Sequence, residues 1–455
     1  NFGTTTLTTA TVNWKVNGVN QTPFPWTGSL TQGSTTSNFS AGYYNFGLGT
    51  SYSIYAWTTS PNGGVEGFNH NDTAKILNTY QAMTGTYTIG GATPNYATFN
   101  TAVTDLANGG VCGPVIFNVR NAIYTEQVII PVISGTSTTN TVTFQSENND
   151  STLVTLTFSP TVADNYTLRF NGADYITIRK MSLKATGATY SRVIQIDNGS
   201  TNDRISNNVI EGTTAATTST NMAVVMENTG TTNTNLTIEN NLIKNGSVGF
   251  YYYGGGVTEN LIIRNNRFSN QYSMAMDVEY SDALTVEGND VTSASANGSY
   301  YGIYLSECDQ NITITKNRIS IPQGYALYLY YCDATAGLRG LIANNFIHAA
   351  GTANSYGLYP YYCTYQNFYY NSVRITNTGV SSCAFFNFGG GTGAFNLQNN
   401  IFSNEGGGYS FYASTTADIN TSDYNDLYTT GINLGYWAGN RTSLATWQTA
   451  SSKDV

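Results

Sequence analysis

The feature that most constrains the fold of this chain is an asparagine that returns every 23 to 33 residues. Each copy ends a short apolar run, as in Leu236–Asn241 and Leu261–Asn266. A repeat of this length and variable spacing is typical of a solenoid, in which each coil contacts its neighbours. We therefore predict an all-β, right-handed parallel β-helix whose aligned positions are Asn208, Asn241, Asn266, Asn289, Asn317, Asn345, Asn371, Asn400 and Asn425.

The chemistry of asparagine explains why one residue type recurs at this place. Its side-chain amide both donates and accepts hydrogen bonds, so stacked copies can satisfy one another inside the molecule. Asparagine also tolerates the left-handed backbone that a tight turn needs. We expect an inward ladder that starts at Asn208, with each asparagine near the left-handed conformation, because Met181 takes the equivalent place one coil earlier.

The strands before these turns show a second repeat. Side chains on a strand alternate between the two faces of the sheet, so an unbroken apolar column must point inward. That column is Ile194, Val224, Phe250, Met276, Ile303, Leu327, Leu358, Phe385 and Phe411. The residues on either side of each member are expected to face outward.

The start of the chain follows other patterns. Residues 1–80 alternate as strands with a turn at Asn17-Gly18, which predicts a partial immunoglobulin-like β-sandwich. Residues 81–114 are predicted to be a linker and cap, with a short amphipathic helix at 98–108 covering the open apolar end of the β-helix. The β-helix itself is assigned to 115–455 and expected to be truncated at its C-terminus, within a longer polypeptide.

Charge and composition exclude several classes of protein. The net charge is −9 and the 18 lysines and arginines form no cluster, which argues against a nucleic-acid partner. No apolar run is long enough to span a membrane. Five cysteines without a CxxC pair and two histidines argue against a zinc site, so we expect no cofactor, with calcium bound by oxygen ligands left open. The low charge and the abundant hydroxyl and amide side chains predict an extracellular or cell-surface location.

Outward positions of the repeat form a stripe of tyrosines and carboxylates. Coils lie about 4.8 Å apart, so these residues are continuous. One row contains Tyr251, Asp277, Tyr304, Tyr328, Tyr359, Phe386 and Tyr412, and the next contains Asp197, Glu227, Tyr253, Glu279, Ser306, Tyr330 and Tyr361. The tyrosines are the candidate ligand-binding residues, because sugar rings pack on aromatic faces while their hydroxyls bond to polar neighbours. The alternative is that stacked tyrosines cover and stabilise the sheet.

Catalysis is the second possibility for this stripe. A glycoside hydrolase needs two carboxyl groups roughly 5 to 9.5 Å apart. Asp197 with Glu227, or Asp277 with Glu279, fits that spacing, so an enzyme would use Glu227, Asp277 or Glu279. A lyase for uronates needs basic groups, and the stripe is acidic.

Two other chemistries have weaker support in the sequence. His348 has no recurring acidic or serine partner, which favours a structural role. Cys308, Cys332 and Cys363 should stack on neighbouring coils, either as a disulfide with one thiol or as inert thiols.

Several phrases resemble a known family. Gly113–Val119 and Ala173–Ile178 resemble the β-helix region of large surface proteins of Bacteroidetes, and Ser443–Gln448 looks like its closing stretch. Asn69–Thr73 is similar to the end of the adhesion-type sandwich modules that precede such helices. The resemblance implies export by the type IX secretion system. It also implies roles as adhesins, gliding-motility proteins or polysaccharide-active proteins.

Together these observations give three functional hypotheses. The first is a non-enzymatic adhesin or stalk segment whose partners are glycans or neighbouring surface proteins. The second is a polysaccharide-active enzyme, a hydrolase or lyase of the β-helix type. The third is a passive structural or filament protein.

Overall fold

The computed structural model describes residues 1–65, 72–227, 230–391 and 394–455. Asn69, His70 and Asn71, which carry part of the predicted module end, lie outside the described residues. The chain divides into two compact units. The first contains Asn1–Thr84 and Thr104–Gly113, and the second contains Gly85–Val103 and Pro114–Val455.

The first unit contains a five-stranded antiparallel sheet in the order β2-β1-β4-β5, with β3 also paired to β1. Asn17 and Gly18 both have positive φ, at 47° and 82°, as expected for the tight turn between β1 and β2. The sheet is the part of the predicted sandwich that the structure describes, and the immunoglobulin-like assignment stays a prediction. The elements are β1 (Leu7–Val16), β2 (Val19–Asn20), β3 (Phe24–Leu30), β4 (Tyr52–Thr59), η1 (Pro61–Gly63) and β5 (Thr73–Thr79).

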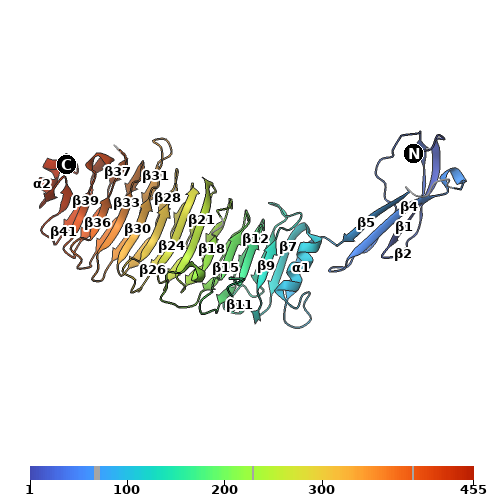
Figure 1. Ribbon diagram of the computed structural model, residues 1–455, viewed down its shortest axis with the longest axis horizontal. Coiled ribbons are helices and arrows are strands. Elements are labelled where there is room, and N and C mark those ends of the chain that lie inside the picture. Colours follow the sequence, from blue (N-terminus) through green and yellow to red (C-terminus); the bar gives the residue numbers. More distant parts are fainter. Residues whose placement is uncertain (66–71, 228–229, 392–393) are drawn as a thin grey trace. The chain divides into compact units, whose positions relative to one another are not determined.

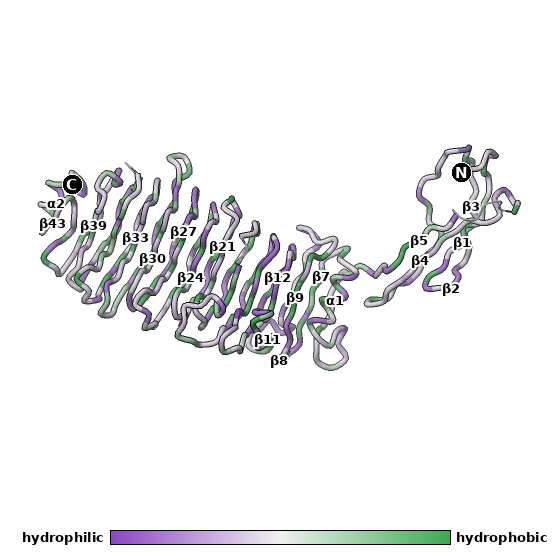
Figure 2. The backbone as a smooth tube through the Cα atoms, viewed as in Figure 1, coloured by the Kyte–Doolittle hydropathy of each residue, from purple (hydrophilic) through white to green (hydrophobic). Residues whose placement is uncertain are grey.

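The second unit is the predicted right-handed parallel β-helix, with three long sheets running along it (Figure 1). Hydrophobic and hydrophilic segments alternate along its coils (Figure 2), as expected when one face of each strand is buried. The first sheet has 13 strands: β6 (Met83–Ile89), β7 (Val111–Val119), β10 (Val142–Ser146), β13 (Ile176–Arg179), β16 (Arg204–Ser206), β19 (Thr237–Glu239), β22 (Ile262–Arg264), β25 (Thr285–Glu287), β28 (Thr313–Thr315), β31 (Gly340–Ala343), β34 (Gln366–Tyr369), β37 (Phe395–Gln398) and β40 (Ile419–Asp423).

The other two sheets complete each coil. The second sheet has 12 strands: β8 (Ala122–Thr125), β11 (Val154–Phe158), β14 (Ser182–Ala185), β17 (Val209–Glu211), β20 (Leu242–Lys244), β23 (Arg267–Ser269), β26 (Asp290–Thr292), β29 (Arg318–Ile321), β32 (Phe346–Ala349), β35 (Ser372–Ile375), β38 (Ile401–Asn404) and β41 (Asp426–Thr429). The third has 13: β9 (Val128–Pro131), β12 (Leu168–Asn171), β15 (Ile194–Asp197), β18 (Val225–Glu227), β21 (Val248–Thr258), β24 (Met274–Asp282), β27 (Tyr301–Ser306), β30 (Gly324–Tyr330), β33 (Ser355–Tyr361), β36 (Cys383–Asn387), β39 (Tyr409–Ala413), β42 (Gly435–Trp437) and β43 (Asn440–Arg441).

Short helices accompany the coils. The predicted capping helix is α1 (Phe99–Gly109). The Phe99 ring lies 5.2 Å from that of Tyr124 and 6.1 Å from that of Phe144, centroid to centroid. The Glu126 carboxylate accepts hydrogen bonds from the backbone N–H groups of Phe99 and Asn100, which satisfies the start of the helix. The remaining elements are η2 (Thr220–Met222), η3 (Thr416–Asp418) and α2 (Leu444–Ser451).

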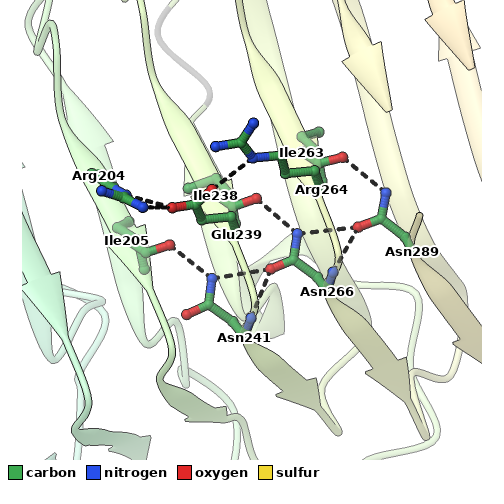
Figure 3. Close-up of polar contacts among 9 residues, drawn as sticks. All are labelled: Arg204, Ile205, Ile238, Glu239, Asn241, Ile263, Arg264, Asn266 and Asn289. Carbon is green, nitrogen blue, oxygen red and sulfur yellow. Dashed lines mark hydrogen bonds and ion pairs between the residues drawn. The ribbon is translucent and has the colours of Figure 1, made fainter. Parts of the chain in front are cut away.

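The asparagine ladder runs through the turn between the first and second sheets (Figure 3). The Nδ2 of Asn266 donates to the Oδ1 of Asn289 at 3.1 Å and to the Ile238 carbonyl at 2.8 Å. Its backbone N–H donates to the same Oδ1 at 3.0 Å. The pattern repeats from Asn208 through Asn400, each donating to the next ladder asparagine. Each side-chain amide therefore forms hydrogen bonds with both the preceding and the following coil.

The two slots that flank the ladder hold other residues. The backbone N–H of Met181 donates to the Oδ1 of Asn208, although its side chain adds nothing. Asn425 donates through Nδ2 to the Oδ1 of Asp454 at 2.8 Å. The other carboxylate oxygen of Asp454 accepts from the Trp447 indole N–H and the Ser422 hydroxyl. A carboxylate suits this slot because every bond it makes there is an accepted one.

The left-handed backbone conformation was predicted for the ladder asparagines, but it occurs one residue before them. Positive φ belongs to the residue before each ladder asparagine, for example Asn240 at 54°, Gly288 at 65° and Tyr370 at 57°. The ladder side chain must point into the core, so the residue before it makes the turn. Because lysine and tyrosine also occupy this place, the conformation follows from the turn rather than from asparagine's own preference.

The inward column is also corrected at one coil. Val225, rather than Val224, pairs with Ile194 and Phe250. Both valines are buried and apolar, so the sequence pattern could not tell which of them belonged to the column. From Phe250 to Phe411 the register is as predicted.

An acidic residue beside the ladder is held by two guanidinium groups (Figure 3). The Glu239 carboxylate accepts from Arg204 and from Arg264 Nε, the latter at 2.6 Å. Burial raises the pKa of Glu239, but the hydrogen bonds from Arg264 and Arg204 outweigh it and leave the pKa below its usual value. This ion-paired group on the first sheet therefore ties three consecutive coils together.

Candidate functional site

The outward stripe lies on the third sheet, and its central positions form one register. We call this the outer row: Arg169, Gln195, Met226, Tyr251, Asp277, Tyr304, Tyr328, Tyr359, Phe386, Tyr412 and Tyr436. Two columns flank it, with Tyr301, Tyr325 and Tyr356 on one side and Tyr253, Glu279, Ser306, Tyr330 and Tyr361 on the other. The predicted tyrosines are thus brought together on one face.

The tyrosine rings stack on one another along the solenoid. The ring centroids of Tyr328 and Tyr359 lie 4.8 Å apart with an interplanar angle of 10°. Tyr330 and Tyr361 stack at 5.3 Å and 13°. Ring faces that cover each other in this way are not open platforms. The expectation that sugar rings lie flat on these faces is therefore revised, since the rings present their edges and hydroxyl groups.

The exposure of the stripe leaves these hydroxyls available. Tyr304, Tyr328, Tyr330, Tyr359 and Tyr361 are half-buried, and Tyr253 is 37% exposed. Among the described residues, no hydrogen-bond partner is found for the hydroxyls of Tyr328, Tyr330, Tyr359 and Tyr361. Burial raises the pKa of Tyr328 and of Tyr359, so both phenols stay protonated and can donate.

A carboxyl pair lies at the end of the tyrosine stack. Asp277 is 6% exposed, and its Oδ1 is buried with no hydrogen-bond partner among the described residues. Burial and the neighbouring Glu279 carboxylate raise the pKa of Asp277 to about 8. Burial also raises the pKa of Glu279, whose Oε1 accepts from the Tyr251 hydroxyl at 3.3 Å. Asp277 is therefore largely neutral at pH 7.

The other predicted carboxyl pair does not form. Because Val225 occupies the inward column, Glu227 pairs with Tyr252 in a buried row instead of lying beside Tyr253. It is 1% exposed, so it is not part of the outer face. Asp197 is ion-paired to Arg169, with Oδ2 2.6 Å from Nε. The assignment of Glu227 to the stripe was wrong by one residue, for the same reason as Val224.

The sequence reasoning missed a pocket with two arginines and two aspartates at the β12 and β15 end of the outer row. It is lined by Arg169, Arg192, Gln195 and Asp197, with Tyr166 and Tyr190 in its walls. Gln195 and Asp197 follow the period-two pattern, but Arg192 and Tyr190 come from a loop. Only the unusual placement of Arg169 in an otherwise aromatic and acidic row could have signalled it.

The remaining candidates stay outside the stripe. The Nε2 of His348 lies 3.0 Å from the Thr376 hydroxyl, and burial together with Arg374 lowers the pKa of His348. Cys308, Cys332 and Cys363 are free, buried thiols. Their sulfurs lie 3.3 to 3.5 Å from backbone carbonyls. Of the two predicted alternatives, the structure therefore contains the stack of thiols and not the disulfide.

A family model described as periplasmic copper-binding protein (NosD) matches residues 181–384. In the described part of the chain, no three histidine, cysteine, aspartate or glutamate side chains gather as a metal site. The three buried thiols lie against carbonyls, and His348 faces a cation. The described residues therefore do not fit a copper ion.

Similarity to one solved structure supports the fold, and two others are more weakly similar. The Dettilon tailspike protein is 12% identical with a TM-score of 0.53, covering 73% of this chain and 65% of its own. A rice weevil pectin methyl esterase is 13% identical at a TM-score of 0.36, over 51% of this chain and 76% of its own. The lacto-N-biosidase of Eubacterium ramulus is 11% identical at 0.40, over 70% and 64%. The chain thus spans less than two thirds of the tailspike's length.

No curated protein matches the chain. Within the described ranges, no helix has both the length and the apolar character needed to cross a membrane.

Proposed function

We propose that this chain is a glycan-binding segment of an exported cell-surface protein, in which the β-helix gives length and stiffness and the outer face binds sugar. The observation that carries the proposal is the set of unpartnered tyrosine hydroxyls on two successive coils, Tyr328 and Tyr330 on β30 and Tyr359 and Tyr361 on β33. The coil spacing of about 4.8 Å is close to the length of one hexose unit, so successive hydroxyls meet successive sugars.

The resemblance of Gly113–Val119 and Ala173–Ile178 to Bacteroidetes surface proteins supports an adhesin or stalk role with type IX export. The match to a periplasmic family also favours export. We further propose the division into a partial immunoglobulin-like module at 1–80, a linker and cap at 81–114, and the β-helix from 115. Neighbouring surface proteins are the second class of partner.

Replacing both Tyr328 and Tyr359 by phenylalanine is expected to weaken polysaccharide binding at least tenfold. The substitution removes two donors and keeps the stacked rings, so stability should change little. Affinity electrophoresis against soluble xylan, glucomannan and pectin measures the retention. The matched control is Tyr428→Phe, an exposed tyrosine on the second sheet. Equal retention of the double variant and the native protein on every polysaccharide that binds would refute the proposal, as would no retention on any.

The carboxyl pair favours hydrolysis as a second candidate. A neutral Asp277 beside Glu279 resembles the acid and base of glycoside hydrolases, which need one protonated and one ionised carboxyl. If this is correct, the protein releases reducing ends from a polysaccharide that it binds, and Asp277→Asn abolishes the release without weakening retention. Retention with no release of reducing ends over a day would leave binding as the function.

A further inference from the structure

The pocket beside Arg192 opens on the outer face of β12 and β15. Its volume is about 260 Å³, slightly below the common range of small-molecule sites, so it has room for one ring. The residues between β11 and β12 and those between β14 and β15 supply its walls, including Tyr166 and Tyr190. The pocket thus lies on the same face as the tyrosine hydroxyls.

Arg169 is already compensated inside this pocket. Its Nε lies 2.6 Å from the Oδ2 of Asp197, and its guanidinium lies 5.7 Å from the centre of the Tyr166 ring. The Oδ1 of Asp197 accepts from Gln195 at 2.8 Å. Both oxygens of this carboxylate are therefore occupied.

Among the described residues, Arg192 has no carboxylate in direct contact and feels Asp197 only from a distance. Its Nε donates to the Thr220 carbonyl at 3.1 Å and its Nη1 to the Oε1 of Gln195 at 3.0 Å, and both acceptors are neutral. In the described part of the chain, Arg192 forms no ion pair with a carboxylate. It is half-buried, and burial lowers the pKa of its guanidinium despite the nearby Asp197. A partly desolvated cation held by neutral groups is electrostatically incomplete, so an anion in the pocket would stabilise it.

The shape of the donors indicates which anion fits. A guanidinium presents its N–H groups in a planar fork that matches the two oxygens of a carboxylate. The Nη2 of Arg192 has no partner among the described residues. Tyr190 and Asn221 also line the pocket, and both residue types carry groups that can bond to ring hydroxyls. Asp164 also lines the pocket, and its side chain is exposed. Its charge disfavours a ligand that carries a second negative group, such as a sulfate, near Asp164 in addition to the carboxylate at Arg192.

We propose that this pocket binds the carboxylate of an acidic sugar, a uronate, belonging to a polysaccharide that lies along the outer row. The inference rests on the proposed function and names its substrate class. The register connects the two places, because Arg169 pairs with Gln195, which pairs with Met226, which pairs with Tyr251. From Arg169 to Tyr328 there are six coil steps, or about 29 Å, which an oligosaccharide of about six units can span.

The test is titration calorimetry with hexamers of galacturonate, of chondroitin sulfate and of cellulose. Arg192→Gln is expected to weaken galacturonate binding at least tenfold and to leave the neutral hexamer unchanged. Arg192→Lys, which keeps the charge and loses the fork, should fall between the two. Arg267→Gln, an exposed arginine on β23, is the matched control and should bind as the native protein does. Equal melting temperatures exclude misfolding as the cause.

The outcomes separate this inference from the proposed function. If the neutral hexamer binds as tightly as the acidic one, or if Arg192→Gln binds galacturonate as the native protein does, the pocket assignment is wrong. It is also wrong if the sulfated hexamer alone binds. Loss of binding in the Tyr328 and Tyr359 double variant would still support the glycan face in those cases. Conversely, if Arg192→Gln loses galacturonate binding and the double variant loses nothing, the pocket stands and the tyrosine proposal fails.

Discussion

Asn317→Ala is expected to lower the free energy of unfolding by about 3 to 5 kcal/mol, because each buried polar group left without a partner costs ~1–3 kcal/mol. Asn317 is 1% exposed and takes part in four side-chain hydrogen bonds. Its Oδ1 accepts from the backbone N–H and Nδ2 of Asn289, and its Nδ2 donates to the Val286 carbonyl and to Asn345. The substitution removes these partners from groups on the two neighbouring coils, Val286 and Asn289 on one side and Asn345 on the other.

Guanidinium-induced unfolding followed by circular dichroism measures this change. The matched control is Asn420→Ala, since Asn420 is exposed and its Nδ2 donates to one residue, Asn396. We expect that control to change the midpoint little. Asn317→Asp should be destabilising as well, since a carboxylate cannot donate to Val286 or Asn345. A loss below about 1 kcal/mol for Asn317→Ala, the low end of the cost of one unpaired group, would show that the ladder is not a main source of stability.

Asp277→Asn is expected to remove a pH dependence of stability that the native protein shows between about pH 4 and pH 8. Burial and Glu279 raise the folded-state pKa of Asp277 from 3.8 to about 8. The groups facing it are Glu279 on its own strand, Tyr251 from β21, and Tyr301 and Tyr304 from β27. None of them is a cation that would favour the ionised form.

The direction in which stability changes with pH follows from proton binding. Between pH 4 and pH 8 the folded state holds a proton on Asp277 that the unfolded state has lost, so stability is highest at low pH and falls as the pH rises. Each pKa unit corresponds to ~1.4 kcal/mol, so the shift of about four units sets an upper limit of about 6 kcal/mol for the whole range. The amide that replaces the carboxyl group cannot ionise, so the variant should gain stability relative to the native protein as the pH rises.

Unfolding free energies measured at pH 5, 6, 7 and 8 for both proteins test this expectation. Asp426→Asn, an exposed aspartate on β41, is the control for a general effect of losing one carboxylate. Parallel pH profiles of the native protein and Asp277→Asn would show that Asp277 ionises normally in the folded state.

The repeat predicted the fold because asparagine chemistry and strand alternation act within each coil. The ladder positions follow from the amide side chain alone, which has to bond to an identical group one coil away. The same reasoning failed at Val224 and Glu227, where two adjacent valines leave the register open by one residue. It also placed positive φ on the ladder asparagines, whereas their inward side chains assign it to the residue before.

The candidate site was predictable only in part. Alternation brought Tyr328, Tyr359 and their neighbours to one face, but the orientation of the rings depends on how they stack between coils. The pocket at the β12 and β15 end depends on Arg192 and Tyr190, which lie in an irregular loop without a period. Such loops are placed by the strands that they connect, so their contacts are visible only once the coils are assembled.

The variable asparagine spacing has a consequence for how such a chain can change. The coil from Asn208 to Asn241 contains 33 residues and that from Asn266 to Asn289 contains 23, yet both keep the same strand pairing with their neighbours. The extra residues all lie in the turns. Insertions and deletions there remodel the rim of the molecule and leave its pitch unchanged, so the surface can diversify while the spacing of the hydroxyls along the axis is conserved.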